Sequence, residues 1–167
     1  MTKENVDVSL NKTESSKIGI EKIIKSNPIY HSIINKKNKI IKFFLTEIKN
    51  IPKLNLNEKF LEATIQDEID VFEKTPLYIA VENKNIEAIQ LLLSLGEINV
   101  NEKSFYFHGN NQIQEKTPLH LAVEKEYIEI IKILLENKNI DVDIEDEQGK
   151  KPIDYTSNNE IIKMLIH

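Results

Sequence analysis

The chain has 167 residues, of which 40% are hydrophobic and 29% charged, and its formal net charge is −5. These proportions are typical of a folded globular domain, and no stretch approaches the roughly 18 consecutive apolar residues of a membrane-spanning helix. The chain contains no cysteine, and Met1 to Leu10 lack the apolar core of a secretory signal. We therefore expect an intracellular protein of the cytoplasm, with the nucleus as the alternative.

The first residues are predicted to precede the folded domain. Residues 1–16 are mostly polar and bury too little apolar surface to offset the entropy of ordering them, so we expect a flexible tail followed by one domain at 17–167. Ser16 is a suitable N-cap, and the isoleucines that follow share one helical face. They predict a helix that covers the open end of the domain, formed by Ile20, Ile23 and Ile24 and ending before Pro28.

Three later segments share one pattern, in which a proline opens a short apolar helix and a second apolar helix ends 17 residues after that proline. They run from Pro28 to Leu45, from Pro76 to Leu93 and from Pro118 to Leu135. Proline suits a first helical turn because it lacks an N–H, and the preceding threonine in two of the copies can cap that turn. Each segment therefore predicts an αα-hairpin. A fourth copy begins at Pro152 and has three fewer residues between its helices.

The connectors between these helix pairs carry two insertions. In the first, Glu58 to Ile69, the apolar residues follow helical spacing and predict a short helix through Phe60, Leu61, Ile65 and Ile69. The second insertion, Ser104 to Asn111, alternates in character and predicts a β-finger, whose tight turn would use the positive φ values available to Gly109 and Asn110.

The β-finger is rich in aromatic residues. Phe105 and Phe107 fall on one face of the predicted strand, and Tyr106 and His108 fall on the other. Two interpretations stay open. The aromatic rings pack on the neighbouring hairpins, or they form a patch that faces a partner, since aromatic residues are enriched at binding hot spots.

These residues carry a resemblance to a known family. The run Thr117-Pro118-Leu119-His120-Leu121-Ala122 matches the T-P-L-H-x-A signature of the ankyrin repeat, a unit of about 33 residues. The connectors agree with it: Asn99-Val100-Asn101 and Asp141-Val142-Asp143 stand where the family has D-V-N, and Asp146 to Gly149 match its D-x-x-G turn. The chain departs from the signature where the motif histidine is replaced by Tyr30, Tyr78 and Asp154, and where Glu73 and Glu115 replace the turn glycine.

The resemblance implies an all-α fold, an ankyrin repeat solenoid of stacked antiparallel helix pairs joined by β-hairpin or loop connectors. The capping helix and a degenerate first repeat would occupy 17–57, and the other repeats about 70–103, 112–145 and 146–167. The resemblance also implies that His120 makes hydrogen bonds that tie adjacent repeats together.

The sequence offers no chemistry that points to an enzyme. His31, His108 and His167 lie far apart and lack metal-ligand spacing, so we expect neither a metal site nor a cofactor. There is no glycine-rich phosphate loop and no nucleophile motif. We therefore predict a protein that is not an enzyme.

The resemblance implies a protein-interaction module that binds through its concave face and hairpin fingers, as an adaptor, an inhibitor or an assembly factor. We expect a monomer or a subunit of a larger complex, with no contact to a membrane. The candidate partner-binding residues are Val71, Phe72, Lys74, Glu82, Asn83, Phe105, Tyr106, Phe107, His108, Ile113, Gln114, Lys116, Glu124 and Lys125.

An alternative function follows from the distribution of charge. Residues 1–53 hold 11 lysines and 5 acidic residues, whereas residues 54–167 hold 11 lysines and 22 acidic residues. The lysine-rich first third could attach the protein to a ribonucleoprotein such as the ribosome, through Lys36, Lys37, Lys39 and Lys42. The interpretation without a binding function is that these lysines form a solvated helix surface.

Overall fold

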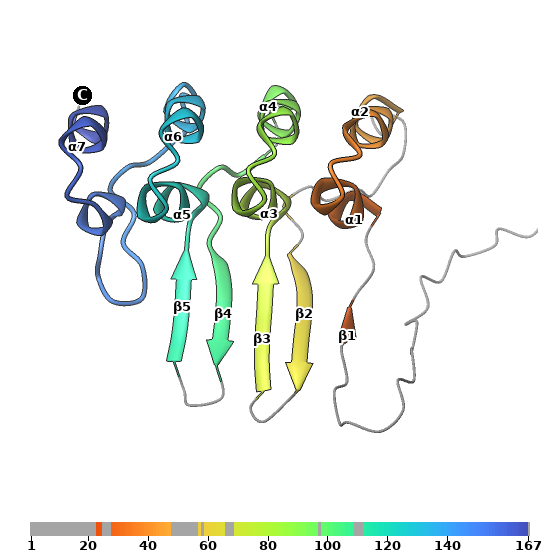
Figure 1. Cartoon of the computed structure of the whole chain (residues 1–167), viewed down its shortest axis with the longest axis horizontal. Helices are drawn as coiled ribbons and strands as arrows, with labels where there is room; N and C mark the ends of the chain where they lie inside the picture. Colours follow the sequence, from red (N-terminus) through yellow and green to blue (C-terminus); the bar gives the residue numbers. More distant parts are fainter. Residues whose placement is uncertain are drawn as a thin grey trace, which may run out of the picture.

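The computed structural model describes residues 23–24, 28–47, 57, 59–65, 69–96, 98–108 and 112–166. Its helices form two layers above a row of strands (Figure 1). The inner layer, next to the strands, contains α1 (Pro28–Ile34), α3 (Pro76–Glu82), α5 (Pro118–Glu124) and the 3-10 helix η2 (Pro152–Tyr155). The outer layer contains α2 (Asn38–Glu47), α4 (Ile86–Ser94), α6 (Ile128–Leu135) and α7 (Asn159–Leu165).

The predicted helix starts are confirmed. Pro28, Pro76, Pro118 and Pro152 each open a helix of the inner layer. The Thr75 hydroxyl accepts a hydrogen bond of 3.1 Å from the N–H of Tyr78, which satisfies one of the donors that a helix start leaves without a partner. In the fourth copy the first helix is a 3-10 helix of four residues, because the shortened connection leaves too few residues for a longer one.

The strands form one antiparallel sheet in the order β1-β2-β3-β4-β5. Their bounds are Ile23–Ile24, Phe60–Ile65, Ile69–Lys74, Ser104–His108 and Gln112–Lys116. The predicted β-finger is therefore confirmed as β4 and β5, with Phe105 paired to Glu115 and Tyr106 to Gln114, while its turn lies outside the described residues.

Two helix predictions are wrong. Phe60–Ile65 form β2 and Ile69 begins β3, because the two strands pair antiparallel, with Phe60 opposite Lys74 and Ile65 opposite Ile69. Ile23 and Ile24 form β1 and not the end of a capping helix, because they pair with Ala63 and Glu62 of β2, whereas Ile20 of that predicted helix lies outside the described residues. Isoleucine favours strands when a partner strand is available, and local spacing cannot show that partner. The predicted tail, residues 1–16, lies outside the described residues.

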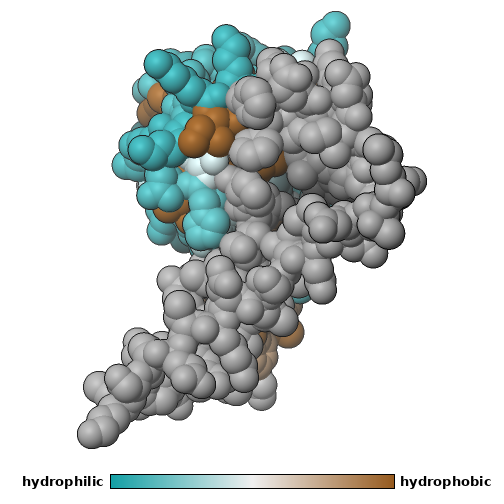
Figure 2. Space-filling model, turned by 90° about the vertical axis from the view of Figure 1, so that its right-hand side faces the viewer, coloured by the Kyte–Doolittle hydropathy of each residue, from teal (hydrophilic) through white to brown (hydrophobic). Residues whose placement is uncertain are grey.

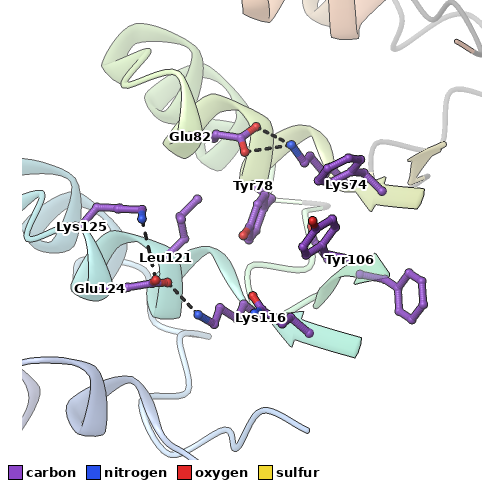
Figure 3. A pocket seen from close by; sticks show the side chains of 12 residues that line it. Lys74, Tyr78, Glu82, Tyr106, Lys116, Leu121, Glu124 and Lys125 are labelled. Atoms are coloured by element: carbon purple, nitrogen blue, oxygen red, sulfur yellow. Dashed lines mark hydrogen bonds and ion pairs between the residues drawn. The ribbon is translucent and has the colours of Figure 1, made fainter. Parts of the chain in front are cut away.

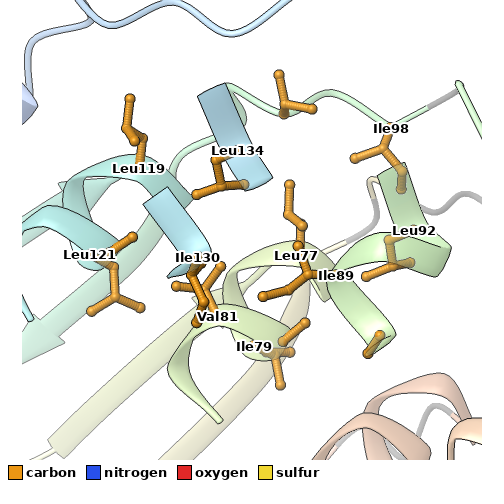
Figure 4. Packing of buried hydrophobic residues seen from close by; sticks show 14 of the residues in the cluster. Leu77, Ile79, Val81, Ile89, Leu92, Ile98, Leu119, Leu121, Ile130 and Leu134 are labelled. Carbon is orange, nitrogen blue, oxygen red and sulfur yellow. The ribbon is translucent and has the colours of Figure 1, made fainter. Parts of the chain in front are cut away.

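The hydrophobic core runs through the helix layers as one cluster (Figure 4). Its members come from every helix pair, and Ile33, Ile41, Leu77, Ile89, Leu92, Leu119, Ile131, Leu134 and Ile161 are almost fully buried. Each pair buries its apolar faces against the next, so the repeats share a core that none could form alone.

Polar contacts also link successive repeats. The Asn85 side chain caps α4 by accepting from the N–H of Ala88, and its amide donates to the Ile33 carbonyl and to Asn38 in the preceding repeat. His120 is buried, and its Nε2 donates to the Lys150 carbonyl of the following repeat across 3.1 Å. The predicted role of His120 is thereby confirmed.

Candidate functional site

A pocket of about 210 Å³ lies where the two hairpins meet the inner helices (Figure 3). Strands β3, β4 and β5 form one side, and helices α3 and α5 form the other. The residues that line it are Phe72, Lys74, Tyr78, Glu82, Ser104, Phe105, Tyr106, Gln114, Lys116, Leu121, Glu124 and Lys125.

Two lysine–glutamate pairs stand in the pocket wall, one from each repeat. Lys74 Nζ lies 2.8 and 2.9 Å from the two carboxylate oxygens of Glu82, and Lys116 Nζ lies 2.7 Å from Glu124 Oε2. The pairs occupy equivalent positions, since each lysine is two residues before the helix-opening proline and each glutamate six after it. Lys125, half exposed, adds a longer contact of 3.7 Å to Glu124.

Aromatic rings form the strand side of the pocket. Phe72 of β3 and Tyr106 of β4 are register partners, and their rings stack with centroids 4.5 Å apart and an interplanar angle of 17°. The Lys74 ammonium lies 4.7 Å from the centroid of Phe72, within the range of a cation–π contact. Of the two interpretations of the finger aromatics, packing on a neighbouring hairpin holds for Tyr106.

Tyr78 sits on the helix side of the pocket, at the position that His120 occupies in the next repeat. Burial raises the pKa of its hydroxyl, and the negative charges of Glu82 and Glu124 raise that pKa further. The phenol therefore stays protonated at neutral pH and can donate a hydrogen bond. Whereas His120 reaches the next repeat, Tyr78 lines the pocket.

The structure gathers most of the predicted partner-binding residues at this pocket. Those in its lining are Phe72, Lys74, Glu82, Phe105, Tyr106, Gln114, Lys116, Glu124 and Lys125. Sequence reasoning missed Tyr78, Ser104 and Leu121. The sequence does contain an indication for Tyr78, because a tyrosine in place of the motif histidine changes which groups that position can contact.

The other predicted residues lie elsewhere. Val71, Phe107 and Ile113 are register partners on the opposite face of the sheet. The Asn83 amide donates to the Ile79 carbonyl across 2.9 Å at the end of α3, which is a helix-end contact. His108 ends β4 beyond the pocket.

The lysines of the alternative prediction lie away from the pocket, at the end of the array formed by α1 and α2 (Figure 1). Lys36 and Lys37 are exposed between α1 and α2, and Lys39 and Lys42 are exposed on α2. Within the described ranges, no group of three or more His, Asp or Glu side chains is arranged to hold a metal ion. No helix in those ranges is long and apolar enough to cross a membrane.

Comparison with known proteins agrees with this architecture. A family model described as ankyrin repeats (3 copies) matches residues 4–104 and 101–167. The chain therefore belongs to the ankyrin repeat family, whose members generally mediate protein–protein interactions and are not typically enzymes. No curated protein matches the chain.

Among solved structures, the chain is similar to the ankyrin repeat domain of Bcl-3, described as a member of the IκB protein family. The TM-score is 0.58 and the sequence identity 17%. The match covers 85% of this chain and 52% of the Bcl-3 chain, so this protein spans about half of that domain. The likeness supports the fold and leaves the partner open.

Proposed function

We propose that the protein binds a segment of a protein partner along its concave face, as an adaptor, an inhibitor or an assembly factor. The concave face is formed by α3 and α5 and by the sheet face that carries Phe72, Tyr106 and Gln114. One observation carries the proposal: the pocket at the centre of this face combines aromatic walls with two fixed ion pairs and a tyrosine hydroxyl.

The composition of the pocket suits one large side chain of a partner. A volume of about 210 Å³ is of the order of the volume of one large side chain. Burial of such a side chain against aromatic rings is favourable. Each lysine is already held by a glutamate, so the walls keep their shape when the pocket is empty. The Tyr78 hydroxyl then orients the partner's side chain by donating a hydrogen bond to it.

The test compares two neighbouring residues of β4 that lie on opposite faces of the sheet. The partner is captured from native cells and identified by mass spectrometry, and its affinity is measured for the wild type, Tyr106→Ser and Phe107→Ser. Tyr106→Ser should weaken binding by about 30-fold, as loss of an aromatic hot spot does. Phe107→Ser should keep the wild-type affinity, because its side chain does not line the pocket.

Melting of both variants separates loss of binding from loss of folding. Tyr106→Ser removes the stack on Phe72 and should melt slightly lower while it keeps its helical content. If Phe107→Ser loses binding and Tyr106→Ser keeps it, the partner binds the opposite face and the pocket is not the site.

A second candidate function is attachment to a ribonucleoprotein through the exposed lysines that lie between α1 and α2 and on α2. The described helical surface at that end is largely hydrophilic around a small hydrophobic area (Figure 2). Binding through Lys36, Lys37 and Lys39 should weaken steeply as salt rises, because each phosphate contact releases counterions. Replacing the three lysines by glutamine should flatten that salt dependence, and an unchanged dependence would remove this candidate.

A further inference from the structure

Strand β5 forms one edge of the sheet, with β4 on its inner side. On its outer side, the turn of the fourth repeat reaches the end of the strand nearest the helices. There the Glu115 N–H donates a hydrogen bond of 2.6 Å to the Glu147 carboxylate. That turn lies beside only the part of β5 that is nearest the helices (Figure 1).

The backbone of Ile113 faces the same open edge. Residues two apart in a strand direct their N–H and C=O groups to the same side. The N–H and C=O of Ile113 therefore point to the outer side of β5, as those of Glu115 do. An open strand edge of this kind is a template for pairing with another strand. The Ile113 side chain is 46% exposed, which makes it one of four exposed large apolar side chains among the described residues.

An apolar row leads across the sheet to this edge. Val71 pairs with Phe107, and Phe107 pairs with Ile113, on the face opposite the pocket. Val71 and Phe107 are half-buried, whereas Ile113 ends the row with a side chain that is more exposed than either. A further strand beside β5 would extend the row and cover that side chain.

The sequence of the edge is self-complementary. Gln112-Ile113-Gln114 reads the same in both directions. In an antiparallel pairing centred on Ile113, two copies exchange a pair of backbone hydrogen bonds at that residue. Isoleucine then faces isoleucine, Gln112 faces Gln114 of the other copy, and no like charges are opposed within the triplet.

We propose that β5 pairs with β5 of a second copy of this chain across a two-fold axis at Ile113. The apolar rows of the two sheets join into one, and the pocket stays open because it lies on the other face. The contact is independent of the proposed partner binding. A pairing this short buries far less than the roughly 1,200 Å² of a stable interface, so the dimer is weak and the protein is monomeric when dilute.

Sedimentation velocity tests this over about 10 µM to about 1 mM, a range suited to a weak dimer. The wild type should rise from monomer mass toward dimer mass. Ile113→Lys and Ile113→Glu should each stay monomeric, because the axis places like charges opposite one another. An equimolar mixture of the two variants should recover the dimer, because lysine then faces glutamate.

Ile40→Lys is the matched control, since Ile40 lies on α2 and is 45% exposed. It should associate as the wild type does. Far-UV circular dichroism checks that every variant melts normally. The proposal is overturned if the wild type remains monomeric throughout, if Ile113→Lys still dimerises, or if the mixture does not.

Discussion

At the scale of single residues, His120 joins the third repeat to the fourth. Its Nδ1 accepts from Thr117, whose N–H is 3.3 Å away, and its Nε2 donates to the Lys150 carbonyl. His120→Ala leaves these buried groups without partners and should lower the free energy of unfolding by about 1–3 kcal/mol in a denaturant titration. Binding of a partner should be unchanged.

His31→Ala is the control for this substitution, because His31 is exposed on α1. Its cost should stay within about 0.5 kcal/mol. Unchanged unfolding of His120→Ala together with lost binding would instead place His120 in the binding site.

The same residue predicts how stability depends on pH. Burial lowers the pKa of His120 below its usual 6.5, helped by Lys116 and Lys103 and opposed by the Lys150 carbonyl and Asp146. The unfolded chain therefore binds a proton that the folded chain resists, and this contribution to stability is complete above pH 6.5 and is lost as pH falls below it. Unfolding titrations across that range should show a shallower pH dependence for His120→Gln than for the wild type, and equal slopes would contradict the assignment.

At the scale of elements, the turn between the two helices of a repeat has one recurring strained position. Lys36, Lys84 and Glu126 have φ values of 51°, 51° and 53°, and each lies eight residues after the opening proline. Side chains other than glycine rarely adopt this left-handed conformation, which commonly ends helices. The array therefore carries the same backbone cost in three repeats.

Glu126→Gly should relieve that cost and raise the free energy of unfolding by up to about 1 kcal/mol. Lys132→Gly, in the interior of α6, should lower it by about 1 kcal/mol, because there glycine only adds flexibility to the unfolded chain. Urea titrations of the two variants give opposite shifts if the conformation at Glu126 is responsible. A loss of stability in both would show that the turn is not strained.

The elements also show what sequence can predict. The helix pairs follow from prolines, caps and apolar spacing, all of which act within a few residues. Strand β2 was missed because Phe60, Leu61, Ile65 and Ile69 fit helical spacing, and its pairing with β3 and β1 appears only in three dimensions. The candidate binding residues came from family positions and from the aromatic insertion, but the sequence did not predict that many of them enclose a pocket. Tyr78 was missed because the motif assigns that position a structural role.

At the scale of the molecule, the array is held by contacts between neighbours. The helices share one core, and the hairpins join into one sheet. The second repeat is therefore connected to the third through the core and through the sheet. The repeats of such an array unfold together when the favourable free energy of the interfaces between repeats exceeds the unfavourable free energy of folding a single repeat. Damage to one interior interface should then destabilise the whole chain.

Leu134 of α6 tests this directly, because it is fully buried within the shared core (Figure 4). Leu134→Ala should lower the free energy of unfolding by about 2–5 kcal/mol, through lost burial and the cavity that remains. Adjacent Leu135 is only half-buried, so Leu135→Ala should cost clearly less. Far-UV circular dichroism and calorimetry should give one coincident transition for each variant. A second transition in Leu134→Ala would mean that the fourth repeat unfolds alone, and a loss below about 1 kcal/mol would mean that Leu134 does not hold the repeats together.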